Sequence, residues 1–275
     1  MRFRLLYILS FVLLSTVLNA HGDLHKRIQE VTEEIHKNPD SANLYFKRGK
    51  LYYQHSNYTN SLKDFKSSSK LGLESVEQDF YIAKSNYHLE NYSRCKRIIK
   101  RILKEDSGNV GVLKLLADIY FKKSKYEKAA NLYDRAILNS EATFPEDYIY
   151  ASKAWYAIDT EYGHKQSQSI LIEGIEKLGD IIVLYNELIS NYIDMQDLDS
   201  AVKFQNKVIK ISNRKERAYL ELANIQIQQE KFEEAKISID KAEDSYKKLP
   251  HRIRNAKFMR EFYSELKTKK IELKK

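Results

Sequence analysis

The chain has 275 residues, of which 43% are hydrophobic and 31% are charged, so its composition is that of a globular protein and excludes a disordered one. A single cysteine, Cys95, excludes an internal disulfide. The net charge is +9, but residues 247–275 alone hold 11 Lys and Arg against three Glu, so the basic excess indicates a basic tail and not a nucleic-acid-binding surface.

The first 20 residues have the pattern of a signal peptide. Met1 to Arg4 is basic, the run from Leu5 to Leu14 is apolar, and Ala20 is a small residue at a plausible cleavage point. The alternative is an uncleaved signal anchor, but residues 5–18 fall short of the roughly 20 apolar residues that span a bilayer. We therefore expect an exported protein, periplasmic or extracellular, with no transmembrane helix after cleavage.

Small and aromatic residues then recur every 34 residues. The small residues are Gly49, Ala83, Ala117 and Ala151, and the aromatic ones are Tyr58, Tyr92 and Tyr126. After a shift of four residues the period resumes at Ala201 and Ala235. A fixed period of this length predicts stacked helix–turn–helix units, in which small residues allow close approach and neighbouring units complete the core.

Over residues 24–245 this pattern resembles the tetratricopeptide repeat (TPR) family. The third repeat matches it most closely, with Leu116, Ala117, Tyr120, Tyr126, Ala129, Tyr133 and Ala136. The resemblance implies an all-α, right-handed α-solenoid, in which the fourth repeat carries about four extra residues in its turn, around Asp159 to Gln166. We expect a half repeat at 24–39, repeats near 42–75, 76–109, 110–143, 144–181, 182–215 and 216–249, and a basic capping helix at 250–275.

The resemblance also implies a concave groove lined by the first helix of each repeat, where TPR proteins bind partner segments. The residues that fall on its three rows are Phe46, Lys50, Tyr53, Phe80, Lys84, Tyr87, Lys114, Asp118, Phe121, Tyr148 and Trp155. Aromatic anchors with a few charges are typical of a recognition surface. The same aromatic residues could instead pack between repeats, and the sequence leaves both interpretations open.

No catalytic motif accompanies the repeats. The eight glycines form no phosphate-binding loop, and neither HExxH nor Gly-x-Ser-x-Gly is present. We therefore predict an exported, non-catalytic scaffold that binds a protein or peptide partner, with no cofactor and no metal. One alternative is a soluble protein that binds a glycan or another small ligand in the aromatic groove. Another is a metal site formed by His21, His25 and the new amino terminus, which a frayed terminus would not orient.

The basic segment at the C-terminus has two possible roles. As a cap it would cover the last repeat with Phe258, Phe262 and Leu266. As a docking face it would make weak contact with an anionic surface through Lys267, Lys269, Lys270, Lys274 and Lys275. The partner's identity and the oligomeric state do not follow from the sequence.

Overall fold

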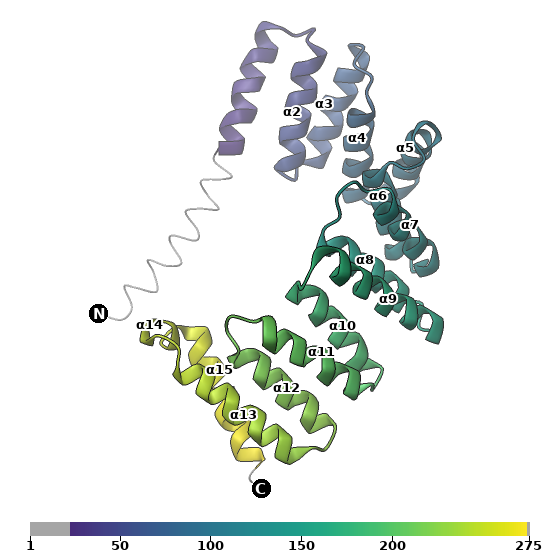
Figure 1. Cartoon of the computed structure of the whole chain (residues 1–275). Coiled ribbons are helices and arrows are strands. Elements are labelled where there is room, and N and C mark those ends of the chain that lie inside the picture. Colours follow the sequence, from purple (N-terminus) through teal and green to yellow (C-terminus); the bar gives the residue numbers. More distant parts are fainter. Residues whose placement is uncertain (1–22, 274–275) are drawn as a thin grey trace, which may run out of the picture. The chain divides into compact units, whose positions relative to one another are not determined.

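The computed structural model describes residues 23–273, and their regular secondary structure is entirely helical (Figure 1). The chain divides into two compact units, unit 1 (Met1–Lys123) and unit 2 (Ser124–Lys275). The expected signal peptide at residues 1–20, His21, Lys274 and Lys275 lie outside the described residues.

The helices are short and follow one another along each unit. Unit 1 has a helix at residues 23–37, then α2 (Ala42–Gln54), α3 (Tyr58–Lys70), α4 (Val76–His88), α5 (Tyr92–Glu105) and α6 (Val110–Lys122). Unit 2 has α7 (Tyr126–Leu138), α8 (Pro145–Tyr156), α9 (Glu161–Leu178), α10 (Ile182–Asp194), α11 (Leu198–Ile211), α12 (Glu216–Gln228), α13 (Phe232–Lys247), α14 (His251–Arg254) and α15 (Lys257–Glu272). In unit 1, each helix from α2 to α6 packs on the next, and α4 also contacts α2 and α6; in unit 2, each helix from α7 to α13 packs on the next. This arrangement is an all-α helical repeat solenoid.

Small residues mark the positions where paired helices come closest. A Cβ atom on Gly49 of α2 would lie only 2.6 Å from Cε1 of Phe65, a fully buried residue of α3. On the same contact, the Ser61 hydroxyl donates a hydrogen bond to the Gly49 carbonyl oxygen at 2.9 Å. In unit 2, Ala223 of α12 and Ala235 of α13 are likewise fully buried. The repeated small residues therefore lie at the helix contacts that the sequence predicts.

The turns between successive helices use a left-handed backbone conformation at residues other than glycine, which the sequence does not predict. The residues with positive φ in these turns are Ser56, Glu90, Ser124, Asp159, Gln196 and Glu230, all between 52° and 61°. Ser56, Glu90 and Ser124 are spaced by 34 residues, and so are Gln196 and Glu230; Asp159 does not fit this spacing. After two of them, the amides of Asn57 and Asn91 donate to the carbonyl oxygens of Tyr52 and Asn86, both at 2.8 Å. This is the hydrogen bond of a Schellman ending, which usually takes glycine at the left-handed position.

The fourth pair differs from the sequence-based expectation. We placed its four extra residues in the turn, whereas α9 begins at Glu161 and runs for 18 residues. The insertion therefore lengthens the second helix of the pair. Because four residues make about one helical turn, Ser167, Leu171 and Gly174 keep their buried face.

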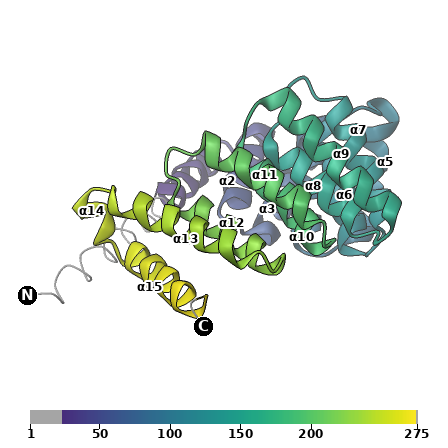
Figure 2. The same cartoon turned by 60° about the horizontal axis from the view of Figure 1, so that its bottom comes forward.

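The basic C-terminal segment is also not a single helix. The short α14 ends at Arg254 and α15 begins at Lys257. Helix α15 lies against α13 (Figure 2), and Met259, Phe262 and Leu266 are buried in the cluster that closes this end of unit 2. Phe258, which we expected in that contact, is 57% exposed because Met259 occupies the inner face instead.

Candidate functional site

In unit 1, the predicted groove residues of α2 and α4 come together as one cluster. We call Phe46, Lys50, Tyr53, Phe80, Tyr81 and Lys84 the aromatic–lysine cluster; all six are partly exposed. The Lys50 Nζ lies 4.5 Å from the ring centroid of Phe46, and the Lys84 Nζ lies 4.7 Å from that of Tyr53. Both distances are within the range of a cation–π interaction. Tyr81, which the sequence analysis did not single out, joins the two helices, with its ring centroid 5.4 Å from that of Tyr53.

The two lysines of the cluster differ in their ionic partners. Lys50 pairs with Glu77 at 3.1 Å. Lys84 has aromatic neighbours alone: its Nζ is 5.3 Å from the Phe80 centroid and 5.5 Å from that of Tyr81, and no carboxylate of residues 23–273 lies within ion-pair distance. Burial of the ammonium group lowers the pKa of Lys84. A half-buried cation without a carboxylate is therefore available to an incoming anionic group.

A histidine, His88, lies at the edge of this cluster. The Tyr53 hydroxyl and His88 Nε2 are 3.1 Å apart, and the His88 ring stacks on Tyr58 at 4.3 Å. Burial, and then the charges of Lys84 and Lys122, lower the pKa of His88. Burial also raises the pKa of Tyr53 to about 12, so both side chains are neutral at pH 7. No sequence motif marks His88, since its role comes from contacts between α2, α3 and α4.

The remaining predicted groove residues of unit 1 lie on α4 and α6. Tyr87 faces Asp118, and burial followed by that carboxylate raises the pKa of Tyr87 to about 12. Lys122, outside the predicted set, lies 5.1 Å from the Tyr87 centroid. Lys114 and Phe121 are partly exposed, and both, like Asp118, already make contacts of their own.

The two predicted residues in unit 2 are placed differently. Tyr148 is fully buried: its ring fills the space above Gly174, and its hydroxyl lies 3.1 Å from Thr143 Oγ1. Trp155 is 6% exposed, and its Nε1 donates to Asp134 Oδ2 at 2.9 Å. Both side chains therefore pack inside the repeat array, and the groove interpretation is wrong for them in this structure.

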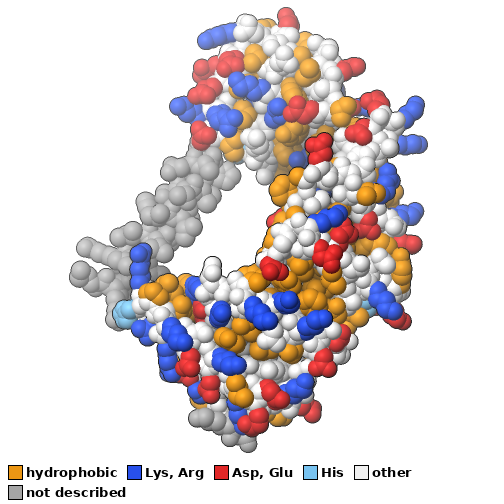
Figure 3. All heavy atoms as spheres, viewed as in Figure 1, with side chains coloured by type: hydrophobic (Ala, Val, Ile, Leu, Met, Phe, Trp, Pro, Cys, Tyr) orange, Lys and Arg blue, Asp and Glu red, His pale blue; other side chains and the backbone are white. Residues whose placement is uncertain are grey.

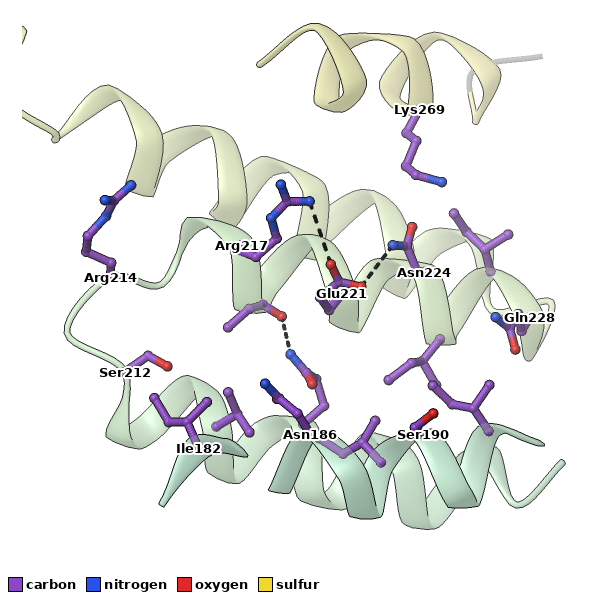
Figure 4. Close-up of a pocket in the computed structure, with 17 residues that line it drawn as sticks. Ile182, Asn186, Ser190, Ser212, Arg214, Arg217, Glu221, Asn224, Gln228 and Lys269 are labelled. Carbon is purple, nitrogen blue, oxygen red and sulfur yellow. Dashed lines mark hydrogen bonds and ion pairs between the residues drawn. The ribbon is translucent and has the colours of Figure 1, made fainter. Parts of the chain in front are cut away.

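Unit 2 has a pocket that the sequence analysis missed (Figure 4). Its volume is about 720 Å³, and it lies between α10, α11, α12 and α15. Its lining combines aliphatic side chains, among them Ile189, Ile193 and Ile225, with uncharged polar ones such as Asn186 and Ser190. The sequence signal for this pocket is limited to the aliphatic residues Ile193 and Ile227, which stand 38 and 72 residues after Trp155 in the same row of the repeat.

Charges gather at one side of this pocket. Arg217 lies 3.8 Å from Glu221 and 3.2 Å from Glu265 of α15, and its guanidinium stands 5.1 Å from the Phe262 centroid. Lys269 of α15 reaches over Asn224 (Figure 4), and no carboxylate of the described chain pairs with it. A volume of this size with a few polar groups is typical of a ligand-binding pocket.

Two further searches of the described residues concern other classes of site. No group of three or more His, Cys, Asp and Glu side chains in residues 23–273 is arranged to hold a metal ion. Within the same range, none of the helices combines the length and the apolar character that crossing a membrane requires.

Comparison with known proteins agrees with the repeat pattern. The tetratricopeptide repeat family model matches residues 184–215 and 216–248. No curated protein matches the sequence significantly.

Among solved structures, the C-terminal part of a TPR repeat-containing protein from Cytophaga hutchinsonii has a TM-score of 0.66 at 14% identity, covering 84% of this chain and 97% of that one. A tetratricopeptide repeat protein from Parabacteroides merdae has a TM-score of 0.55 at 16% identity, covering 92% and 95%. Yeast Tom70 has a TM-score of 0.54 at 15% identity, and the match covers 74% of this chain but 44% of Tom70. These identities show the fold alone. Residues 184–248 therefore match tetratricopeptide repeats by sequence, and the chain shares the fold of the tetratricopeptide repeat proteins.

Proposed function

We propose that this protein is an exported, non-catalytic scaffold that binds a protein or peptide partner on the α2–α4 face of unit 1. The observation that carries the proposal is Lys84, a half-buried cation that rests on aromatic rings and has no carboxylate partner in the described chain. Aromatic side chains and a desolvated charge are the usual anchors of a protein interface. The TPR fold supports this class of function because its surfaces serve recognition, although fold alone does not fix the role.

The partner would place an anionic or hydrogen-bond-accepting group against Lys84 and an apolar side chain against the rings of Tyr53 and Phe80. Because Lys84 is partly desolvated, a contact there is screened less by salt than one to an exposed lysine. Lys50, which already pairs with Glu77, would contribute less.

The test compares the chain with two lysine variants after its partner has been recovered by crosslinking in the exporting compartment. Lys84→Met should weaken the Kd by at least about tenfold, since a hydrogen bond to a charged group contributes about 1.5–3 kcal/mol. Lys66→Met, on the exposed side of α3, is the matched control and should leave the Kd unchanged. Equal binding by all three proteins would show that the partner uses another surface.

A second candidate function is binding of a small ligand, such as a glycan, by a soluble protein. The observation that favours it is the pocket of about 720 Å³ in unit 2, and not the aromatic groove of the sequence-based expectation. A ligand of that pocket should raise the melting temperature with dose, as a ligand specific for the native state does. The increase should be lost in Ser190→Trp, which would place a large ring in the pocket.

A further inference from the structure

Helix α5 carries an unusual concentration of positive charge. Its 14 residues, YSRCKRIIKRILKE, include six Lys and Arg and one Glu. Lys96, Lys100 and Lys104 follow one another at intervals of four residues, so they line one side of the helix. Lys and Arg side chains stand at the right-hand edge of Figure 3, where Figure 1 places α5. The charge balance of the sequence does not reveal this helix, because the basic excess lies in residues 247–275 and the charges of the remaining chain nearly cancel.

Elsewhere the chain places opposite charges at this spacing. Lys165 pairs with Glu161 at 2.6 Å and Lys177 with Glu173 at 2.7 Å, each four residues apart. In α5, like charges occupy these positions, which destabilises a helix. Of its six cations, only Arg101 pairs with a carboxylate of the described residues, that of Asp79. No carboxylate of the described part of unit 1 pairs with the lysine row, so these charges are available to an anionic partner.

The lysine row borders a recess. A depression of about 500 Å³ lies between α5 and α6, and the three lysines line it together with Leu103 and Tyr120. Ile99 and Leu116 complete its lining. The Lys96 Nζ is 6.0 Å from the Tyr120 centroid. The surface thus combines a row of cations with an apolar hollow beside it.

The apolar hollow distinguishes between possible anionic partners. A membrane-binding helix presents apolar side chains that project into the lipid. In α5, Ile99 and Ile102 point inward instead, with 1% and 2% of their surface exposed, and Leu103 lines the hollow. A side chain from a protein segment can enter the hollow, whereas a bilayer surface would meet only the lysines. The lysine Cα atoms are about 6 Å apart along the helix axis, which is also the spacing of carboxylates at every fourth position of a partner helix.

We propose that α5 and α6 form a second interaction surface, which docks an acidic amphipathic helix of a protein partner. Its carboxylates would lie along Lys96, Lys100 and Lys104, and one apolar side chain would enter the hollow between Leu103, Leu116 and Tyr120. This surface is separate from the aromatic–lysine cluster on α2 and α4, so either binding role can hold without the other.

The probe for the test is a synthetic helical peptide with Glu at every fourth position and one Leu on the same face. The variant changes Lys96, Lys100 and Lys104 to Gln. Its matched control changes Lys63, Lys66 and Lys70 of α3 to Gln, which removes the same charge from exposed positions of the same unit. We expect the α5 variant to weaken the peptide Kd by about tenfold or more and the α3 variant by less than about twofold, because charge pairs act over a Debye length.

Two further measurements keep the proposal falsifiable. Replacing the Leu of the peptide by Ala should also weaken binding to the unchanged protein, and vesicles of phosphatidylglycerol and phosphatidylcholine should bind less well than the peptide. The α5 variant should melt no lower than the unchanged protein, since it relieves repulsion between like charges. Equal losses in both lysine variants, no effect of the Leu, or preferential binding to the vesicles would overturn the proposal.

Discussion

At the scale of single residues, the closest helix contacts depend on the absence of a side chain. Gly49 sits in the interior of α2, where glycine is normally unfavourable, and Phe65 occupies the space that a Cβ would take. The fully buried ring of Phe65 cannot move into solvent to relieve the overlap. The contact therefore requires glycine for packing and not for backbone freedom.

Gly49→Ala should consequently lower the melting temperature. The better helix propensity of Ala contributes about 0.5–1 kcal/mol of stability, but overpacking typically costs about 1–3 kcal/mol. Asn43→Ala, at an exposed position of the same helix, is the control and should not lower it. Thermal unfolding of both variants checks the expectation, which fails if Gly49→Ala is as stable as Asn43→Ala.

Asp134 is a second residue whose environment has a measurable consequence. Burial raises the pKa of its carboxyl to about 6, even though Trp155 Nε1 donates a hydrogen bond to it. Because the folded-state pKa lies above the unfolded value, the folded protein binds this proton more tightly. Stability from this group is therefore present at pH below about 4 and is lost as the pH rises through about 6.

Asp134→Asn should make the protein more stable at pH 7 and leave it equally stable below about pH 4, because the amide keeps an acceptor for Trp155 without a charge. Trp155 is the only tryptophan of the chain, so its fluorescence reports on this site. The emission should titrate with a midpoint near pH 6 in the unchanged protein. The same titration in the Asn variant would contradict the assignment.

At the scale of helices, α15 is tied to α13 by charge as well as by packing. The Lys270 Nζ lies 2.6 Å from Glu243 Oε2 and 2.7 Å from Asp240 Oδ1. The hydrogen bond from Lys270, and then that from Lys247, lowers the pKa of Glu243 to about 2. Lys270 is therefore a structural contact, in contrast to its expected place on a docking face for anionic surfaces. The use of Lys267 and Lys269 for such docking stays a prediction.

Lys270→Met should lower the melting temperature at neutral pH. Because the folded-state pKa of Glu243 is depressed, its contribution is present above the unfolded value of about 4.5 and is lost as the pH falls toward 2. The difference between the two proteins should therefore shrink over that interval. Lys248→Met, at an exposed position, is the control. A difference that does not change with pH would assign the effect to packing instead.

At the scale of the whole molecule, the proposed export depends on the residues that precede the described helices. Mass spectrometry of the protein from the periplasm or the medium should find a chain that begins at His21 or within a few residues of it. Finding Met1 intact in a membrane fraction would favour the signal-anchor alternative.

The period of 34 predicted the helix pairs and the small buried residues, because both depend on short stretches that repeat along the chain. It did not predict the turn conformation, since Ser56, Glu90 and Glu230 take a left-handed backbone without glycine. Nor did it place the insertion of the fourth repeat, because an added helical turn and a longer loop have the same length in sequence.

The accessibility of the candidate groove residues was decided by tertiary packing. Tyr53 and Tyr148 both fell on the predicted groove rows, yet Tyr53 is partly exposed and Tyr148 is fully buried. The difference arises from the neighbouring helices, since Tyr148 lies over Gly174 of α9 and Tyr53 borders Lys84 of α4.

Contacts between helices also decide the unit 2 pocket and the unpaired lysines of α5. The pocket wall includes Lys269, which reaches α12 because α15 folds back onto the preceding pair. Whether a lysine is paired depends on a carboxylate from another helix, as Lys270 has and Lys100 lacks. Local periodicity sets which residues form helices and which faces are apolar, whereas contacts between distant helices set which side chains remain available for binding.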